Sequence, residues 1–191
     1  MSIEKNEIRK AVLNRRELLA PEEREEYSKV ICKKLEKLKE YKEANIIFAY
    51  INSKSEVETR TVLLNSINKG KTVCLPHSIK HTFELEFYRI FDFKKELQIG
   101  SYGILEPVPN VERIVLPQKA ELIIIPGVAF DLNLNRVGYG KGYYDKFLSS
   151  VPESIPKIAL AYDFQVLEGI RAGENDIKMD MVITEKRIIT V

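Results

Sequence analysis

The amino-acid sequence predicts an α/β fold, built on a mostly parallel sheet with helices on both faces. Short runs of β-branched and aromatic residues recur along the chain and are typical of buried strands. Helical patterns alternate with these runs, and this alternation indicates parallel strands joined by crossover helices. The 191 residues contain no internal repeat and no long linker, so we expect a single domain over residues 1–191.

The expected elements follow in chain order. Apolar residues recur with a helical period through the first forty residues, where Pro21 suits the first turn of a helix. A second helical pattern covers residues 58–70, with Thr59 as the expected N-cap and Gly70 as the stop. The other runs predict a helix over residues 143–150, strands over residues 45–51, 71–76, 83–90, 120–127 and 157–163, and one or two strands within residues 179–191.

Charge and composition exclude several classes of function. The 30 basic residues nearly balance the 28 acidic ones, whereas a nucleic-acid binder usually carries a basic surplus or a basic stripe. Because no apolar run suits a signal peptide or a membrane span, we expect a cytoplasmic protein that does not bind membranes. Cys32 and Cys74 are expected to be small buried or half-buried thiols, since no zinc-type spacing joins them to His77 and His81.

Three glycines lie within five positions in "NRVGYGKGYYDKFL", residues 135–148. If this segment is extended, Gly138, Gly140 and Gly142 leave one side without β-carbons, and a large ligand can approach the backbone amides. The glycines follow a predicted central strand and precede a predicted helix. Ligands of open α/β sheets bind beyond the carboxyl ends of the strands, so glycines that follow a central strand lie where a site is expected.

We interpret this segment as a phosphate-binding loop. Backbone amides near a helix N-terminus favour an anion, and Arg136 and Lys141 add positive charge. The segment is neither a P-loop nor a dinucleotide-binding fingerprint, because its order is G-x-G-x-G after a long loop. The alternative is a glycine-rich loop that packs beneath the pair Tyr143 and Tyr144, and the residues alone leave both open.

Asp145 lies near the start of the predicted helix. The helix dipole favours a carboxylate there in any protein, so its position alone does not indicate a function. If a second carboxylate converges on it, the pair could hold Mg²⁺ against phosphate oxygens. Asp176 and Asp180 are the candidates, because they precede a predicted strand and could lie at the ligand edge of the sheet.

These motifs resemble those of a known family. "PGVAFD" and "NRVGYGKGYYD" closely resemble the signature of the 5-formyltetrahydrofolate cyclo-ligases, also called 5,10-methenyltetrahydrofolate synthetases. Further similarities are the K-x-x-x-R spacing of Lys5 and Arg9, "PEER" at 21–24, "SEVET" at 55–59 and "ENDIKMDMVIT" at 174–184. The resemblance implies a doubly wound fold, similar to the group of ribose-5-phosphate isomerase and the CoA-transferases.

The resemblance also implies a reaction. 5-Formyltetrahydrofolate and MgATP would give 5,10-methenyltetrahydrofolate, ADP and phosphate, through phosphorylation of the formyl oxygen and attack by N10. The partners would be ATP and the folate, with or without a polyglutamate tail, and we expect a monomer. Two other classes stay open: a sugar-phosphate isomerase or CoA-transferase relative, and a nucleotide sensor that binds ATP without consuming it.

Site residues follow from the resemblance at matching positions. Lys141 and Arg136 would lie beside the transferring phosphoryl group, and Asp145 and Asp180 would bind magnesium. The implied ATP-binding residues are Lys5, Arg9, Arg136, Gly138, Tyr139, Gly140, Lys141, Gly142, Tyr143 and Tyr144. The implied folate-binding residues are Ile51, Glu56, Tyr139, Gly140, Lys141, Gly142 and Tyr143.

Glu56 and Tyr139 are the two positions where the interpretation is most open. One carboxylate can accept paired N–H bonds from the amino-amide edge of a pterin, which is the role that the resemblance implies for Glu56. Without the resemblance, Glu56 is simply a glutamate that leads into a helix. Many relatives carry arginine at the position of Tyr139, so a phosphate contact is either lost here or supplied by Lys141, or the aromatic ring favours a flat ligand.

Overall fold

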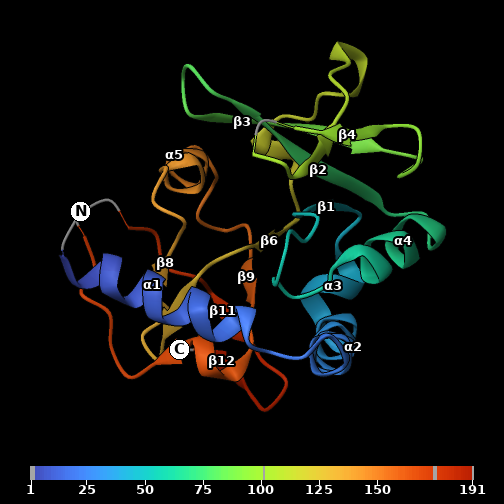
Figure 1. Ribbon diagram of the computed structural model, residues 1–191. Helices are drawn as coiled ribbons and strands as arrows, with labels where there is room; N and C mark the ends of the chain where they lie inside the picture. The colour runs from blue at the N-terminus through green and yellow to red at the C-terminus, as the bar shows by residue number, and fades with distance from the viewer. Residues whose placement is uncertain (1–2, 101, 174–175, 191) are drawn as a thin grey trace.

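The computed structural model describes residues 3–100, 102–173 and 176–190, and its largest element is a seven-stranded sheet (Figure 1). The strand order is β12-β11-β9-β6-β1-β2-β3. The inner strands are parallel, whereas β3 and β12 at the two edges run antiparallel to their neighbours, so the predicted mostly parallel sheet is confirmed. The strands are β1 (Ile46–Phe48), β2 (Thr72–Ile79), β3 (Glu84–Ile90), β6 (Leu122–Ile125), β9 (Lys157–Leu160), β11 (Met181–Ile183) and β12 (Ile188–Thr190).

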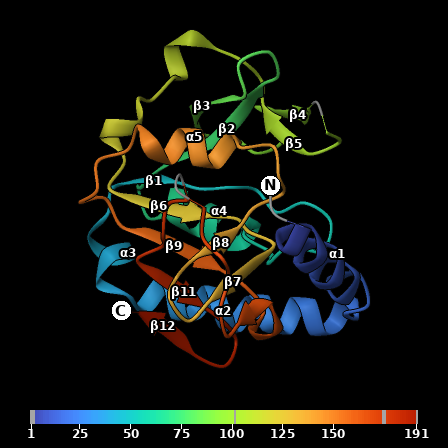
Figure 2. The same ribbon diagram turned by 90° about the vertical axis from the view of Figure 1, so that its left-hand side faces the viewer.

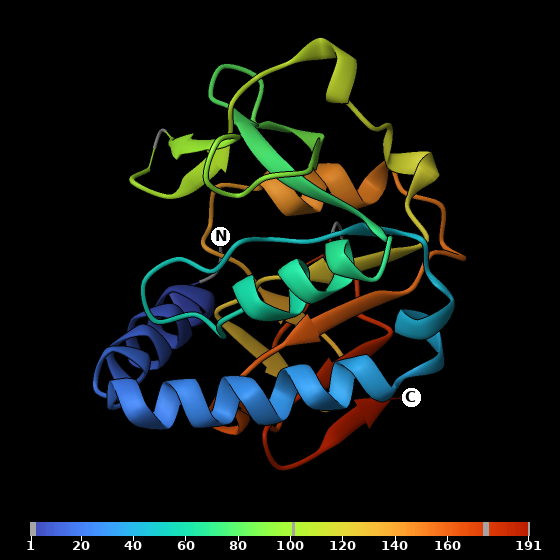
Figure 3. The same ribbon diagram turned by 90° about the vertical axis from the view of Figure 1, so that its right-hand side faces the viewer.

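Helices cover both faces of this sheet, as the sequence predicts. The helices α2 (Pro21–Lys37), α3 (Lys39–Glu43) and α4 (Arg60–Asn68) lie on one face, and α5 (Tyr143–Ser149) lies on the other (Figures 1 and 3). Successive residues of a strand point to opposite faces, and both faces are buried here. Ile47 packs with the first group of helices, whereas the Phe48 ring lies 6.2 Å from the Phe147 ring of α5. The buried strands therefore have continuous apolar sequences.

The N-terminal helix α1 (Ile3–Glu17) packs against a separate small sheet (Figure 2). This sheet has the order β10-β7-β8. Val12 of α1 contacts its apolar face at Val128 and Val137. The sequence predicts only a loop between the central strand and the glycines, because strands of two or three residues show no clear alternation. The strands are β7 (Ala129–Asp131), β8 (Arg136–Val137) and β10 (Val166–Leu167).

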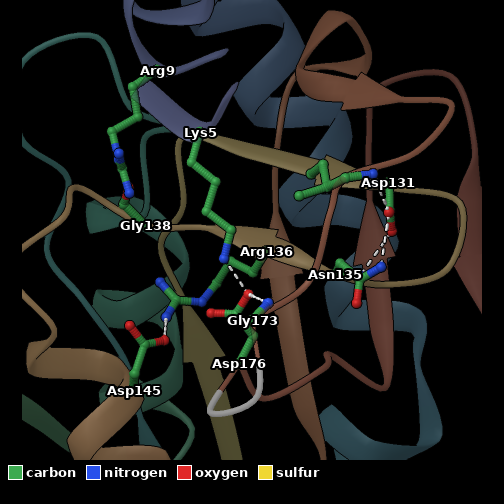
Figure 4. A network of polar contacts seen from close by, with 10 residues as sticks. Lys5, Arg9, Asp131, Asn135, Arg136, Gly138, Asp145, Gly173 and Asp176 are labelled. Atoms are coloured by element: carbon green, nitrogen blue, oxygen red, sulfur yellow. Dashed lines mark hydrogen bonds and ion pairs between the residues drawn. The ribbon is translucent and has the colours of Figure 1, made fainter. Parts of the chain in front are cut away.

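The Asp131 carboxylate connects several segments of this small sheet through hydrogen bonds. Its fully buried carboxylate accepts hydrogen bonds from the backbone amides of Asn133, Asn135 and Ile170 at 2.8 to 3.0 Å. The Asn135 side chain donates a further bond at 2.9 Å. Because Arg136 follows Asn135 directly, this carboxylate fixes the turn that presents Arg136 (Figure 4).

We expect Asp131→Asn to lower the free energy of unfolding by about 2 kcal/mol, because an amide nitrogen would face backbone donors in a buried site. For a chain of this size, the melting temperature should fall by roughly 4–8 °C. Thermal unfolding checks this, with Asp92→Asn as the control, since Asp92 is partly exposed and accepts from one backbone amide at 2.8 Å. Equal melting temperatures for Asp131→Asn and wild type would contradict the prediction.

The helix ends agree only in part with the sequence pattern. Pro21 begins α2, and Gly70 follows α4 with φ of +83°, as expected for a helix start and stop. Thr59 occupies the N-cap position of α4, but its hydroxyl donates to the Tyr50 carbonyl at 2.8 Å instead of capping the helix. The sequence does not predict the hairpin of β4 (Leu97–Ile99) and β5 (Leu105–Pro107). Short 3-10 helices cover Val111–Arg113, Pro117–Lys119 and Asp163–Gln165.

The strand order reverses between β1 and β6. From β1 the chain proceeds through α4 to β2 on one side, and from β6 it proceeds through α5 to β9 on the other side. In doubly wound sheets, ligands bind at the carboxyl ends of the strands beside such a reversal. The segments after Phe48 and after Ile125 are therefore where a site is expected. Within the described ranges, none of the helices has the length and apolarity that crossing a membrane requires.

Candidate functional site

A cavity of about 500 Å³ lies at this reversal. Tyr50 and Ile51, which follow β1, and Pro126, which follows β6, line it together with the glycine segment. This volume lies within the range typical of small-molecule sites. Ile51 and Tyr139 are more than eighty residues apart in the sequence, and the sheet brings them to one cavity, whereas Gly138, Gly140 and Gly142 are not among its lining residues.

Glu56 is a buried carboxylate in the wall of this cavity. Only 7% of the residue is exposed, and its Oε2 accepts from the Ser53 backbone amide at 2.8 Å. The Tyr139 hydroxyl donates to the other oxygen, Oε1. Burial raises the pKa of Glu56 above its usual value, while the Tyr139 hydroxyl, the Ser53 amide and the charge of Arg16 oppose this rise.

The glycine segment is not extended, so that interpretation from the sequence is wrong. Gly140 and Gly142 have φ of +92° and +77°, in the left-handed region that glycine adopts without strain. Gly142 is the residue before α5. At Gly138 a β-carbon would lie 2.7 Å from Nη1 of Arg136, so this glycine makes room for the guanidinium. The glycines therefore serve two turns and one close contact.

Arg136 connects the carboxyl end of β6 to α5. Its buried guanidinium donates to the Asp145 carboxylate and, at 3.4 Å, to the Pro126 carbonyl. The guanidinium carbon lies 5.8 Å from the centre of the Tyr144 ring. Asp145 thus pairs with a cation in this structure, and Arg136 holds a fixed position beside the cavity (Figure 4).

Lys5 and Arg9 of α1 extend toward Arg136 and Gly138 (Figure 4). The Lys5 ammonium pairs with Asp176, which also accepts from the Gly173 amide at 2.6 Å. Burial tends to raise the pKa of Asp176, but the Gly173 amide and Lys5 outweigh it and lower that pKa. Nε of Arg9 donates to the carbonyl of Gly138 at 2.6 Å. The structure therefore brings the N-terminal basic pair to the glycine segment.

Lys141, Tyr143 and Tyr144 also line the cavity. Lys141 is exposed, whereas burial holds the pKa of Tyr144 well above its usual value. The Tyr143 and Tyr102 hydroxyls lie 3.2 Å apart, and burial followed by this contact raises the pKa of Tyr143 to about 12. Tyr143 and Tyr144 pack against other aromatic rings and also line the cavity. The two expectations for the glycine segment, a phosphate-binding loop and a loop that packs beneath this pair, are therefore compatible.

Asp180 lies away from the other predicted site residues. Its carboxylate accepts from the Lys157 amide at 2.7 Å, at the amino ends of β9 and β11. Asp145 lies near the carboxyl end of β6, so the length of a strand, roughly 10 Å, separates the two along the sheet. A residue that directly precedes a parallel strand lies at the edge opposite the ligand edge. The structure does not bring Asp145 and Asp180 together as a metal-binding pair.

Other cavity residues escaped the sequence analysis. Arg16 is 2% exposed, yet it lies in the charged run "NRRELL", and nothing in the sequence distinguishes it from its exposed neighbours. Glu106 is also buried in the cavity wall, and it accepts from the Ser78 hydroxyl at 2.8 Å. Its Oε2 lies 3.2 Å from Nδ1 of His77. Glu106 belongs to a hairpin strand of three residues, which the sequence did not predict.

Comparisons with known proteins identify the family and the fold. The model of the 5-formyltetrahydrofolate cyclo-ligase family matches residues 1–185. A probable 5-formyltetrahydrofolate cyclo-ligase of Schizosaccharomyces pombe is 32% identical over 202 residues, covering 99% of this chain and 98% of the relative. The solved structure of 5,10-methenyltetrahydrofolate synthetase of Aquifex aeolicus is similar with a TM-score of 0.84 and 37% identity, covering 97% of this chain and 92% of that one. The enzyme of the same name from Mycoplasma pneumoniae gives a TM-score of 0.77 with 25% identity, covering 96% and 99%.

Proposed function

The chain belongs to the 5-formyltetrahydrofolate cyclo-ligase family, and on this basis we propose that it converts 5-formyltetrahydrofolate and ATP to 5,10-methenyltetrahydrofolate, ADP and phosphate. One observation carries the proposal. A single cavity has a buried carboxylate, Glu56, in its wall and two cations, Arg136 and Lys141, in the wall formed around the glycine segment. The carboxylate suits the donors of a pterin edge, and the cations suit phosphate oxygens.

In this proposal the folate binds through Glu56. The amino-amide edge of the pterin donates two N–H bonds to the carboxylate, and charge-assisted bonds of this kind are stronger than neutral ones. Ile51 and Tyr143 line the same cavity and offer apolar surface to a flat ring. The formyl group at N5 would then point toward the glycine segment, where the γ-phosphoryl group of ATP would lie.

The chemistry requires an activated oxygen. A formamide carbonyl is a poor electrophile, and N10 is too weakly basic to close on it with loss of the oxygen as hydroxide. Transfer of the γ-phosphoryl group to the formyl oxygen gives an iminium phosphate; N10 then attacks the same carbon, loses its proton, and phosphate leaves. Lys141 and Arg136 would neutralise charge during the transfer, and Lys5 and Arg9 would bind the remaining phosphates.

Magnesium fits one part of this site. Mg²⁺ in ATP-dependent enzymes is usually held by one or two carboxylates and the substrate phosphates, and it neutralises phosphate charge. Asp145 lies beside Arg136, and its carboxylate is 41% exposed, so it can accept such an ion at the glycine segment. Asp180 faces Lys157 instead and does not fit the same ion. We therefore assign the metal contact to Asp145.

We expect Asp145→Asn to raise the Mg²⁺ concentration needed for half-maximal activity several-fold, because a neutral amide is a weaker ligand for a hard cation. Asp180→Asn should leave the magnesium dependence unchanged. Titration of Mg²⁺ at fixed ATP separates the two variants. A raised requirement in Asp180→Asn, or an unchanged one in Asp145→Asn, would overturn this assignment.

The activity itself has a direct test. Absorbance near the methenyl-folate band should rise when 5-formyltetrahydrofolate and MgATP are both present, and should stay constant without ATP. A nucleotide sensor would bind ATP and give no change, and a sugar-phosphate isomerase would act without magnesium. The similarity in fold to ribose-5-phosphate isomerase and the CoA-transferases, the single domain, the monomeric state, polyglutamate binding and the cytoplasmic location stay predictions.

A further inference from the structure

We propose that Tyr139, supported by Arg16, is a positioning residue that keeps Glu56 an ionised and oriented acceptor for the folate. The inference rests on the proposed function, because it takes Glu56 as the group that receives the pterin edge. It adds a role for two residues of the cavity wall that need not touch the reacting atoms. Arg16 comes from α1 and Tyr139 from the glycine segment, so the arrangement links two distant parts of the chain.

The hydrogen bonds form a chain with a fixed direction. Nη1 of Arg16 donates to the Tyr139 hydroxyl at 3.0 Å, and this hydroxyl donates to Oε1 of Glu56. A guanidinium can only donate and a carboxylate can only accept, so the tyrosine proton must point at Glu56. Nε of Arg16 donates to the Ser55 hydroxyl at 3.2 Å, which anchors the buried guanidinium. Arg16 therefore fixes the direction in which the Tyr139 hydroxyl donates.

This arrangement leaves room for the ligand. An ionised carboxylate has about four acceptor positions, two on each oxygen. Tyr139 takes one position on Oε1, and the Ser53 amide takes one on Oε2 at 2.8 Å. One position remains on each oxygen, which is what a pair of parallel N–H donors requires. Tyr139 can thus orient the carboxylate without competing with the pterin.

The same contacts maintain the charge of Glu56. Burial opposes ionisation, whereas the Tyr139 hydroxyl, the Ser53 amide and Arg16 favour it. A protonated Glu56 would present its own O–H to the pterin donors and lose one acceptor. Although 47% of Tyr139 is exposed, desolvation of its hydroxyl and the neighbouring Glu56 raise its pKa, so it remains a donor throughout the neutral range. The other titratable groups that line the cavity are Tyr50, Tyr102, Tyr143, Tyr144, Glu17, Glu106, Lys54, Lys141 and Arg136.

The test removes only the tyrosine hydroxyl. We expect Tyr139→Phe to move the acidic limb of kcat/KM for the folate, measured between pH 5 and 9 at saturating MgATP, upward by roughly one pH unit. Below this limb the variant should be roughly tenfold less efficient than wild type, and at pH 9 the two should agree within about threefold, because Glu56 is then ionised in both. The KM for ATP should not change, because the hydroxyl that the variant removes is bonded to Arg16 and Glu56, and any contact of ATP with the ring or backbone of residue 139 is kept. In Glu56→Gln the limb should disappear, which identifies Glu56 as its source.

A matched control is available outside the cavity. The Tyr88 hydroxyl donates to Glu86 at 2.6 Å on β3, so Tyr88→Phe removes the same kind of bond and should leave the profile unchanged. A superimposable profile for Tyr139→Phe, or a loss of efficiency that persists at pH 9, would overturn the inference. NMR titration of the Glu56 carboxyl carbon in the ligand-free protein adds a readout that needs no turnover. There the Glu56 midpoint should rise in Tyr139→Phe, whereas failure of the proposed function would show as an inactive wild type.

Discussion

Replacement of Lys141 by alanine is expected to lower kcat by about 10²–10³-fold, the usual cost of losing one preorganised charge at a transition state. Lys141 lines the cavity from an exposed position between Gly140 and Gly142. Both glycines have positive φ, so the turn that presents the lysine depends on the backbone and should survive the substitution. The loss should therefore appear in turnover and leave the melting temperature close to that of wild type.

Steady-state kinetics with both substrates saturating measure this effect. Lys146→Ala is the matched control, because the Lys146 ammonium pairs with Glu84 at 2.8 Å and does not line the cavity. Its kcat should stay within about twofold of wild type, since an exposed ion pair contributes little. A folded Lys141→Ala protein with nearly normal kcat would remove Lys141 from the phosphoryl-transfer step.

Glu56→Gln is expected to raise the KM or Kd for the folate roughly ten- to a hundredfold. Hydrogen bonds to charged groups contribute about 1.5–3 kcal/mol, and each 1.4 kcal/mol corresponds to a factor of ten in affinity. The amide also places a nitrogen donor where Glu56 now accepts from Tyr139 and Ser53, so one existing contact is lost as well. Binding of ATP without folate should barely change, because the cations assigned to the phosphates, Arg136 and Lys141, are unaltered in this variant.

The control for this variant lies two residues away. Glu58 is exposed and makes its contacts through the backbone, so Glu58→Gln should leave both substrates unaffected. Measurement of both ligands on the same folded variant distinguishes a pterin contact from a stabilising role. Normal folate affinity in Glu56→Gln would return this residue to a structural glutamate that precedes a helix.

The sequence was sufficient for the strands and helices of the main sheet. Runs such as residues 120–127 are apolar because both faces of the sheet are buried, and this pattern is visible without coordinates. The small sheet of β7, β8 and β10 was missed, because its strands are too short to show alternation. Its stability depends on Asp131, whose partners come from two separate segments. Side-chain contacts of this kind have no signature in a single sequence.

For the site, too, some features could be predicted from the sequence and others could not. The glycine segment and the basic pair of α1 were predicted to act together, and the structure places Arg9 against Gly138. The prediction of an extended backbone at the glycines was wrong, since the spacing of glycines does not distinguish an extended segment from consecutive turns. Asp180 was assigned from its place before a strand, but the amino end of a parallel strand lies at the edge opposite the ligand. Arg16 could not be separated from its charged neighbours, because only the fold shows that it is buried.

The reversal of strand order between β1 and β6 also determines when the site can exist during folding. Glu56 and Arg16 belong to the half of the chain before β6, and Arg136 and Lys141 belong to the half after it. The two halves are joined in the sheet by pairs such as Ile47 with Leu122, which are distant in sequence. Closing such long loops is among the slow steps in the folding of a domain. A nascent or truncated chain can thus form its local helices and still lack the pocket, so binding competence is a property of long-range assembly and reports on complete folding.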